Sequence, residues 1–106
     1  MAYERLVKKL TKENLWLYIL RLLKDRPMYG YEIVKAIKEK FKFSPATVTV
    51  YVVLYRMESE GLIKKVKEEK SVGRIGRAYY APTEKGLEAF EKGKEFIENI
   101  YKLLFS

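Results

Sequence analysis

The stretch that most constrains the fold runs from Ser44 to Leu62 and reads SPATVTVYVVLYRMESEGL. Ser44 is a suitable N-cap, and Pro45 suits a first helical turn, where a missing N–H costs nothing. Gly61 is a natural helix stop, so we predict a helix that begins at Ser44 and ends at Gly61. The strong β-propensity of TVTVYVVLY leaves a buried strand as the alternative. The helical continuation RMESEGL favours the helix.

The expected helix has two different faces. At helical spacing one side forms a core stripe, made of Val50, Val53, Leu54, Met57 and Gly61. The opposite side has little charge and is rich in aromatic and β-branched groups: Val48, Tyr51, Val52, Tyr55 and Ser59. Such a face is costly to leave in water, so we expect another molecule to bind there.

The charge of the chain indicates the kind of partner. The 106 residues suffice for one compact domain, and 22 Lys plus Arg against 14 Asp plus Glu give a net charge of +8. This surplus favours a polyanion, with nucleic acid as the first candidate and an anionic membrane surface as the second. Residues 62–77 carry a net charge of +4, whereas residues 78–106 carry −1. The basic surplus therefore lies near the middle of the chain.

Several functional classes are disfavoured by composition. The chain has neither Cys nor His, which removes disulfides, thiolate metal sites and the commonest general base. We therefore expect no metal, no cofactor and no enzymatic activity. The sequence contains no apolar run long enough to span a membrane and no signal-peptide core near its start. These features predict a soluble, cytoplasmic protein without membrane partners.

The rest of the chain predicts a mainly α fold with a small two-stranded β wing. Residues 2–25 read as one helix, or as two joined at residues 11–14, and Met28-Tyr29 reads as a short extended piece. The remaining elements are, in order, a helix over 31–41, the helix described above, an exposed strand over 63–70, a hairpin loop over 71–76, a return strand over 77–81 and a Thr83-capped helix over 84–105. This order is that of a winged helix-turn-helix.

Several strings resemble the PadR family of transcriptional regulators. They are MYGYEI at 28–33, VYVVLYRMESEGL at 50–62, and Tyr79-Tyr80 followed by TEKG at 83–86. The short end after the wing resembles the family type with a single C-terminal helix. The resemblance implies a winged helix-turn-helix domain over 1–83 and a dimerisation helix over 84–106. It also implies a homodimer that binds a palindromic operator in double-stranded DNA and represses transcription.

The resemblance places the third helix in the major groove and the wing along the backbone or minor groove. The candidate DNA-binding residues are Ser44, Thr47, Val48, Thr49, Tyr51, Val52, Tyr55, Lys64, Lys65, Arg74 and Arg77. None of the helix residues can make the bidentate guanine contact of arginine, so we expect modest base readout and strong phosphate binding. The third helix also starts about two residues earlier than is usual in the family, which affects which side chains reach bases.

Alternatives remain open for these residues. Tyr51 and Tyr55 could be half-buried packing residues, and the wing could be a solvated hairpin. A winged-helix module that binds protein instead of DNA would fit the same order of elements, although the +4 of the wing region argues against it. RNA binding is a third possibility, but an exposed helix suits the B-form major groove better than A-form RNA.

The last helix carries an apolar seam that one small domain cannot cover. Together with the first helix it forms the candidate dimer interface, made of Tyr3, Leu6, Leu10, Leu87, Phe90, Ile97, Tyr101 and Leu104. The alternative is that the seam folds back on its own chain. Trp16 suggests a planar aromatic effector, because some family members bind such molecules between aromatic side chains, but ordinary core packing explains it better.

Overall fold

Helices dominate the structure, a computed structural model that describes residues 1–69 and 77–106. The elements are α1 (Ala2–Leu10), the 3-10 helix η1 (Lys12–Asn14), α2 (Leu15–Leu23), β1 (Met28–Tyr29), α3 (Gly30–Phe41), α4 (Thr47–Ser59), β2 (Ile63–Glu69), β3 (Arg77–Pro82) and α5 (Glu84–Phe105). The N-terminal segment is thus two helices and not one. The predicted hairpin loop, with Arg74, falls outside the described residues.

The core lies where α2, α3 and α4 meet the sheet. Apolar residues on nearly every side of α2 are buried, and α4 contributes one stripe to the same cluster, made of Val50, Leu54 and Met57. The helix over this stretch is confirmed, and it ends at the expected place, since Gly61 has a φ of +78°. That conformation is strained for residues with a side chain.

The start of α4 differs from the prediction. Ser44 is not the N-cap: the helix begins at Thr47, and Ala46 precedes it in an extended conformation without a side-chain capping bond. Residues 43–46 have no regular secondary structure, and Pro45 is buried before the helix instead of forming its first turn. Ser44 itself is exposed. The backbone N–H of Val50 closes the first turn on the carbonyl of Ala46 at 3.1 Å.

The sheet has three strands in the described ranges, in the order β1-β3-β2, all antiparallel. The mainly α fold with a wing is confirmed, and the short extended piece predicted at Met28-Tyr29 is β1, but its pairing with the wing as a third strand was not predicted. Met28 pairs with Tyr80 and is buried, and the Tyr29 ring meets the Tyr79 ring edge-on at 5.4 Å. A two-residue strand has no periodicity of its own, so it exists only through these long-range partners.

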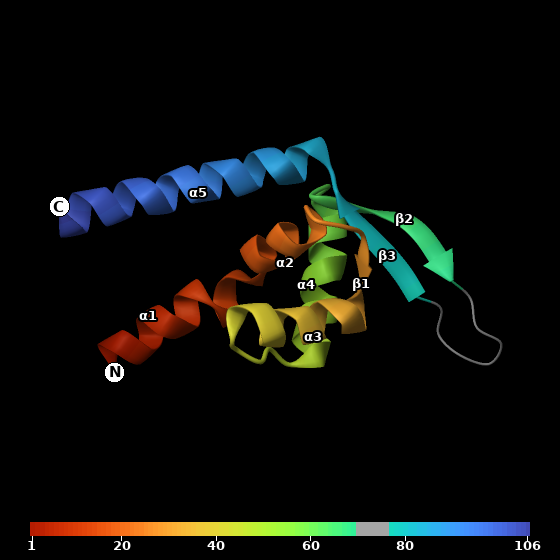
Figure 1. The fold of residues 1–106 in the computed structure, drawn as a ribbon, viewed down its shortest axis with the longest axis horizontal. Coiled ribbons are helices and arrows are strands. Elements are labelled where there is room, and N and C mark those ends of the chain that lie inside the picture. Colours follow the sequence, from red (N-terminus) through yellow and green to blue (C-terminus); the bar gives the residue numbers. More distant parts are fainter. Residues whose placement is uncertain (70–76) are drawn as a thin grey trace.

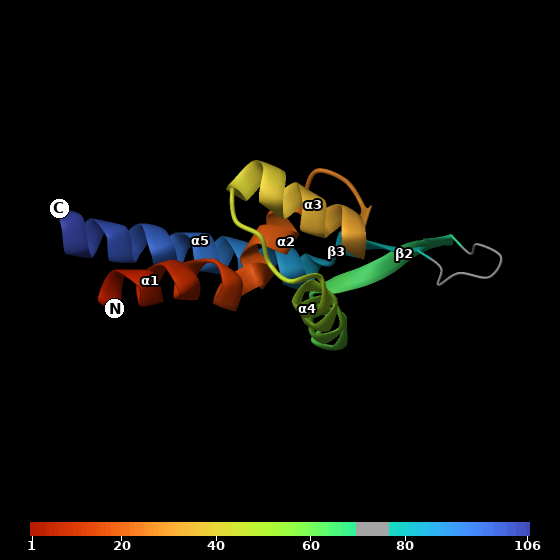
Figure 2. The same cartoon turned by 90° about the horizontal axis from the view of Figure 1, so that it is seen from below.

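The two terminal helices extend away from the core at the end opposite the wing (Figure 1). In both views α1 and α5 run towards the same end of the molecule, where both chain termini lie; the two helices are separated in Figure 1 and overlap in Figure 2. No residue of α1 is buried, and the far half of α5 exposes large apolar side chains on several sides. These helices therefore have apolar surface that the described protomer does not cover.

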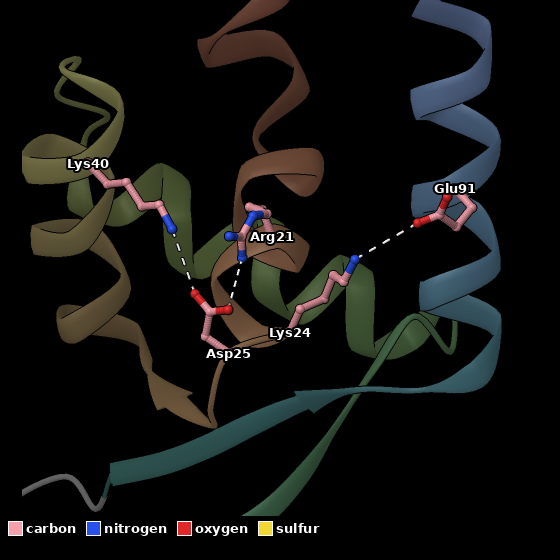
Figure 3. Close-up of polar contacts among 5 residues, drawn as sticks. All are labelled: Arg21, Lys24, Asp25, Lys40 and Glu91. Atoms are coloured by element: carbon pink, nitrogen blue, oxygen red, sulfur yellow. Dashed lines mark hydrogen bonds and ion pairs between the residues drawn. The ribbon is translucent and has the colours of Figure 1, made fainter. Parts of the chain in front are cut away.

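Exposed ion pairs connect α2 to its neighbours, as Figure 3 shows. Asp25 accepts from Arg21 at 3.0 Å and lies 3.6 Å from Lys40 of α3, while Lys24 reaches Glu91 of α5 at 3.8 Å. The hydrogen bond from Arg21 lowers the pKa of the Asp25 carboxyl. Because all five side chains are well exposed to solvent, these pairs contribute little to stability and mainly orient the helices.

The first turn of α5 is fixed by backbone contacts. The predicted cap is confirmed, since the Thr83 hydroxyl accepts from the N–H of Gly86 at 3.0 Å, and the N–H of Thr83 donates to the carbonyl of Leu62 at 3.1 Å. A Cβ added at Gly86 would lie 2.1 Å from that same Leu62 oxygen. The Leu62 carbonyl belongs to the backbone and cannot move aside as the tip of a side chain can, so position 86 requires glycine.

Replacing Gly86 with alanine should therefore destabilise the fold by about 1–3 kcal/mol or more, the usual cost of overpacking. Urea unfolding followed by far-UV circular dichroism would measure this loss. Glu88→Ala, on an exposed position of the same helix, is the matched control and should change the free energy of unfolding little. Equal stability of the two variants would contradict the contact.

Candidate nucleic-acid interface

An open groove of about 870 Å³ lies between α4, the start of α3 and one side of the sheet. It is lined by Tyr29, Gly30, Tyr31, Thr47, Val48, Tyr51, Val52, Tyr55, Lys65, Glu68, Arg77, Ala78 and Tyr80. Three parts of the chain that are far apart in the sequence thus share one concave surface. Its lining is strongly aromatic, with five tyrosines, and carries two cations and one carboxylate.

Most of the predicted binding residues gather in this groove. Those that line it are Thr47, Val48, Tyr51, Val52, Tyr55, Lys65 and Arg77. Ser44, Thr49 and Lys64 are exposed but are not part of the lining, and Arg74 is among the residues left undescribed. The geometry therefore brings one face of α4, from Thr47 to Tyr55, together with the two strands of the wing, as the sequence predicts, and leaves Ser44 before α4 outside.

The outward face of α4 is open to solvent despite its apolar character. Val48 is 74% exposed, Val52 49% and Tyr55 59%, whereas Val50 and Leu54, on the opposite side of the same helix, are fully buried. This contrast follows from helical periodicity, because α4 packs on the core through one stripe alone. The face is a ridge of methyl groups and tyrosine hydroxyls without a charged side chain before Arg56.

Tyr51 is held against the start of α3. A Cβ added at Gly30 would lie 2.5 Å from the Cε1 and Cζ atoms of the Tyr51 ring and 2.8 Å from its hydroxyl. Glycine at position 30 therefore allows the ring to lie directly on the backbone of the first turn of α3. The alternative that both tyrosines are half-buried packing residues fits Tyr51, which is half-buried. It does not fit Tyr55, which is exposed.

Tyr80 forms the floor of the groove. It is only 3% exposed, and burial, with smaller effects from Glu58 and nearby tyrosines, raises its pKa to about 12. A buried phenol avoids ionisation because the charged form would lose its hydration. Near neutral pH the groove therefore has an uncharged floor, and its charges come from the sheet residues around it.

The cations of the sheet are placed by aromatic and ionic contacts. The Arg77 guanidinium lies 4.8 Å from the centre of the Tyr29 ring, and the Lys65 ammonium lies 3.7 Å from a carboxylate oxygen of Glu68. The first contact keeps Arg77 at the edge of the groove without neutralising it. The second places a negative charge on a surface that was predicted to be basic.

Sequence reasoning missed about half of the lining. The missed residues are Tyr29, Gly30, Tyr31, Glu68, Ala78 and Tyr80. A signal for some of them was available, since Tyr29, Gly30 and Tyr31 belong to the MYGYEI string and Tyr80 to the Tyr79-Tyr80 pair. Nothing in the local sequence indicates that Gly30 touches Tyr51 or that Glu68 enters the groove, because both facts depend on tertiary packing.

The candidate dimer residues are mostly exposed. Tyr3 is 72% exposed, Leu6 54%, Leu10 51%, Leu87 37%, Ile97 46%, Tyr101 65% and Leu104 68%. Phe90 differs, because it packs partly against the protomer's own core under the Lys24 ammonium. Additional exposed apolar residues that were not predicted lie beside the seam: Val7, Phe96, Ile100, Leu103 and Phe105.

A second, smaller cavity lies beside Trp16. Trp16 is half-buried, donates to the Asn14 side chain at 3.2 Å, and borders this cavity of about 370 Å³ with Val53 and Met57. Within residues 1–69 and 77–106, no three His, Cys, Asp or Glu side chains gather closely enough to hold a metal ion. None of the helices in these ranges has the length and apolar character that crossing a membrane requires.

The order of elements and the groove beside α4 define a winged helix-turn-helix protein. The model of the transcriptional regulator PadR-like family matches residues 19–92. This range covers most of the chain, so the chain belongs to the PadR-like family of transcriptional regulators, which confirms the resemblance. No curated protein sequence matches it significantly.

Solved structures agree with this assignment. A PadR family transcription regulator from Clostridium difficile R20291 is 32% identical, with a TM-score of 0.70 over 87% of this chain and 98% of that one. A transcriptional regulator from Clostridium thermocellum is 29% identical, with a TM-score of 0.75 over 85% of each chain. Bacillus subtilis PadR in complex with operator DNA is 24% identical, with a TM-score of 0.66 over 74% of this chain and 45% of that one, and shows the shared fold.

The contact between Gly30 and Tyr51 can be tested directly. Gly30→Ala should displace the Tyr51 ring and shift its aromatic NMR resonances, because the ring is the movable partner. The free energy of unfolding should change by less than about 1 kcal/mol, since alanine is the better helix former and offsets part of the clash. In a Tyr51→Ala background the same substitution should be stabilising. Unmoved Tyr51 resonances would contradict the contact.

Proposed function

We propose that this protein is a sequence-specific double-stranded DNA-binding regulator that represses transcription as a homodimer on a palindromic operator. The observation that carries the proposal is the groove, where the exposed face of α4 and the cations of the wing open onto one surface. A protein with the same fold, Bacillus subtilis PadR, has been solved with operator DNA. DNA in the cytoplasm would be the partner, as the sequence predicts.

The exposed face of α4 is suited to the major groove of B-form DNA. That groove is about 12 Å wide and admits one helix. Val48 and Val52 would contact thymine methyl groups, and the hydroxyls of Thr47 and Tyr55 would bond to base edges or phosphates. With no arginine or amide on this face, base readout is modest and favours A·T-containing sites.

The residues around α4 would bind the DNA phosphates. Arg77 and Lys65 line the groove on the sheet side, and Lys64 is exposed at the start of β2. The hydroxyl of Tyr51 lies at the N-terminal turn of α3, where backbone N–H groups are also directed outward. Arg74 at the wing tip remains part of the proposal from the sequence.

A homodimer would cover the apolar surface of α1 and α5. Both helices lie at the end of the molecule opposite the wing, so a two-fold contact there leaves both grooves free. Two-fold symmetry implies a palindromic site with half-sites about one helical turn, or 34 Å, apart. Under this proposal residues 84–106 act as the dimerisation helix and residues 1–83 as the DNA-binding part.

The alternatives make different predictions. A winged-helix module that binds only protein would not shift a random duplex at low salt, whereas the proposed regulator should. An RNA-binding protein would prefer an A-form duplex or single strand of the same length. A planar aromatic effector stays a prediction from Trp16, and the cavity beside that side chain is the place to look for it.

Binding to duplex DNA should weaken steeply as salt increases, because neutralised phosphates release counterions. Arg77→Ala should lower the affinity and reduce the slope of log K against log salt by about 0.9, the value for one phosphate contact. Fluorescence anisotropy across a salt series would measure both. Lys92→Ala, on the exposed side of α5, should leave the slope unchanged. Equal slopes for the wild type and Arg77→Ala would remove Arg77 from the interface.

Wild-type protein at micromolar concentration should sediment with twice the 12.6 kDa mass of one chain. Tyr101→Glu and Leu104→Glu should shift this equilibrium towards monomer, because each places a charge in the proposed apolar contact. Analytical ultracentrifugation reports the mass. Lys102→Ala, at a position between them on the same helix, changes the net charge by the same one unit and is the control for charge alone. A wild-type monomer would contradict the dimer.

A further inference from the structure

The wing contains a β-bulge that decides which side chains face α4. In the β2–β3 pairing Lys65 is opposite Tyr80, but Lys67, and not Val66, is opposite Tyr79. The register therefore shifts by one residue, and Val66 is the extra residue of the bulge. Because side chains alternate along a strand, one inserted residue exchanges the two faces for everything that follows.

The consequence is visible in the ion pairs of β2. Glu68 is opposite Ala78, whose side of the sheet carries Tyr80 and lines the groove. Lys65 and Glu68, three residues apart, therefore share the groove side and pair at 3.7 Å. Lys67 and Glu69 lie on the other side, where they pair at 3.0 Å and Lys67 covers the Tyr79 ring. With unbroken alternation Glu68 would point away from α4.

The bulge thus places a carboxylate in the middle of the surface that DNA is proposed to occupy. Among the described residues that line the groove, the charged side chains are Lys65, Arg77 and Glu68. Lys65 is 44% exposed and Glu68 53%, so both are accessible to a phosphate. A phosphate that approaches Lys65 must displace Glu68 from it and then remain near an uncompensated negative charge.

We propose that Glu68 competes with backbone phosphate for Lys65 and so lowers the affinity of the groove for DNA of any sequence. This inference rests on the proposed function. Binding to random sequence depends almost wholly on phosphate contacts, whereas binding to an operator also has the contacts of α4. A groove carboxylate that acts on phosphate contacts common to both complexes weakens both by the same free energy, so it lowers the affinity for DNA without changing the ratio of operator to random binding.

The test compares two glutamates one residue apart on the same strand. Glu68→Gln should bind a random-sequence duplex about threefold more tightly, the effect of removing a unit charge about 6 Å from a phosphate in water. Its slope of log K against log salt should be steeper by up to about 0.9. Glu69→Gln removes the same charge outside the groove and is the matched control. It should stay close to the wild type in both measurements.

A double-mutant cycle identifies Lys65 as the residue through which Glu68 acts. In a Lys65→Met background the gain from Glu68→Gln should largely disappear, because the cation for which phosphate and carboxylate compete is gone. A duplex selected from a random pool by the wild type gives the specific affinity. Both affinities should rise by the same factor in Glu68→Gln, so the ratio of selected to random affinity should stay that of the wild type, because the phosphate contact is common to both complexes.

The outcomes separate this inference from the proposed function. If the wild type binds duplex DNA but Glu68→Gln and Glu69→Gln behave alike, competition at Lys65 is refuted and the regulator assignment stands. If Glu68→Gln weakens the selected duplex and leaves the random one unchanged, Glu68 reads a base and the inference is overturned. If neither the wild type nor any variant binds a duplex at low salt, both the proposed function and this inference are refuted.

Discussion

The fold depends on the burial of one face of α4 against α2 and the sheet. Val50, Leu54 and Met57 are removed from water there, and each such side chain contributes about 1.5–3 kcal/mol when fully buried. The periodicity of the helix then leaves Val48, Val52 and Tyr55 no inward position, so the same packing that stabilises the domain creates the exposed face of α4. Stability and the candidate function therefore arise from the two sides of one helix.

Features that rest on local periodicity could be predicted from the sequence. The core stripe of α4, its end at Gly61, the capped start of α5 and the paired strands of the wing all carry strong local patterns. Features that depend on a partner far away in the sequence could not be predicted in this way. The extended piece at Met28-Tyr29 becomes the strand β1 only by pairing with Tyr80 and Tyr79, and α4 begins at Thr47, after Pro45, which is buried outside the helix.

The candidate site divides in the same way. Tyr51, Val52 and Tyr55 could be found because their positions follow from the helix, and Lys65 and Arg77 because the wing is short and basic. Gly30, Tyr80 and Glu68 could not be predicted. The place of Gly30 depends on contact with a ring on another helix, and the place of Glu68 depends on a one-residue register shift. Net charge alone would place only cations in the groove.

The contact between Gly86 and Leu62 joins the first turn of α5 to the segment between α4 and β2. Leu62 directly precedes β2, and its backbone carbonyl meets the first turn of α5, where backbone atoms cannot rotate away as side chains do. The direction of α5 is therefore constrained relative to the joint between α4 and β2. If two copies pair through α5, as proposed, this joint would set the spacing between their α4 helices.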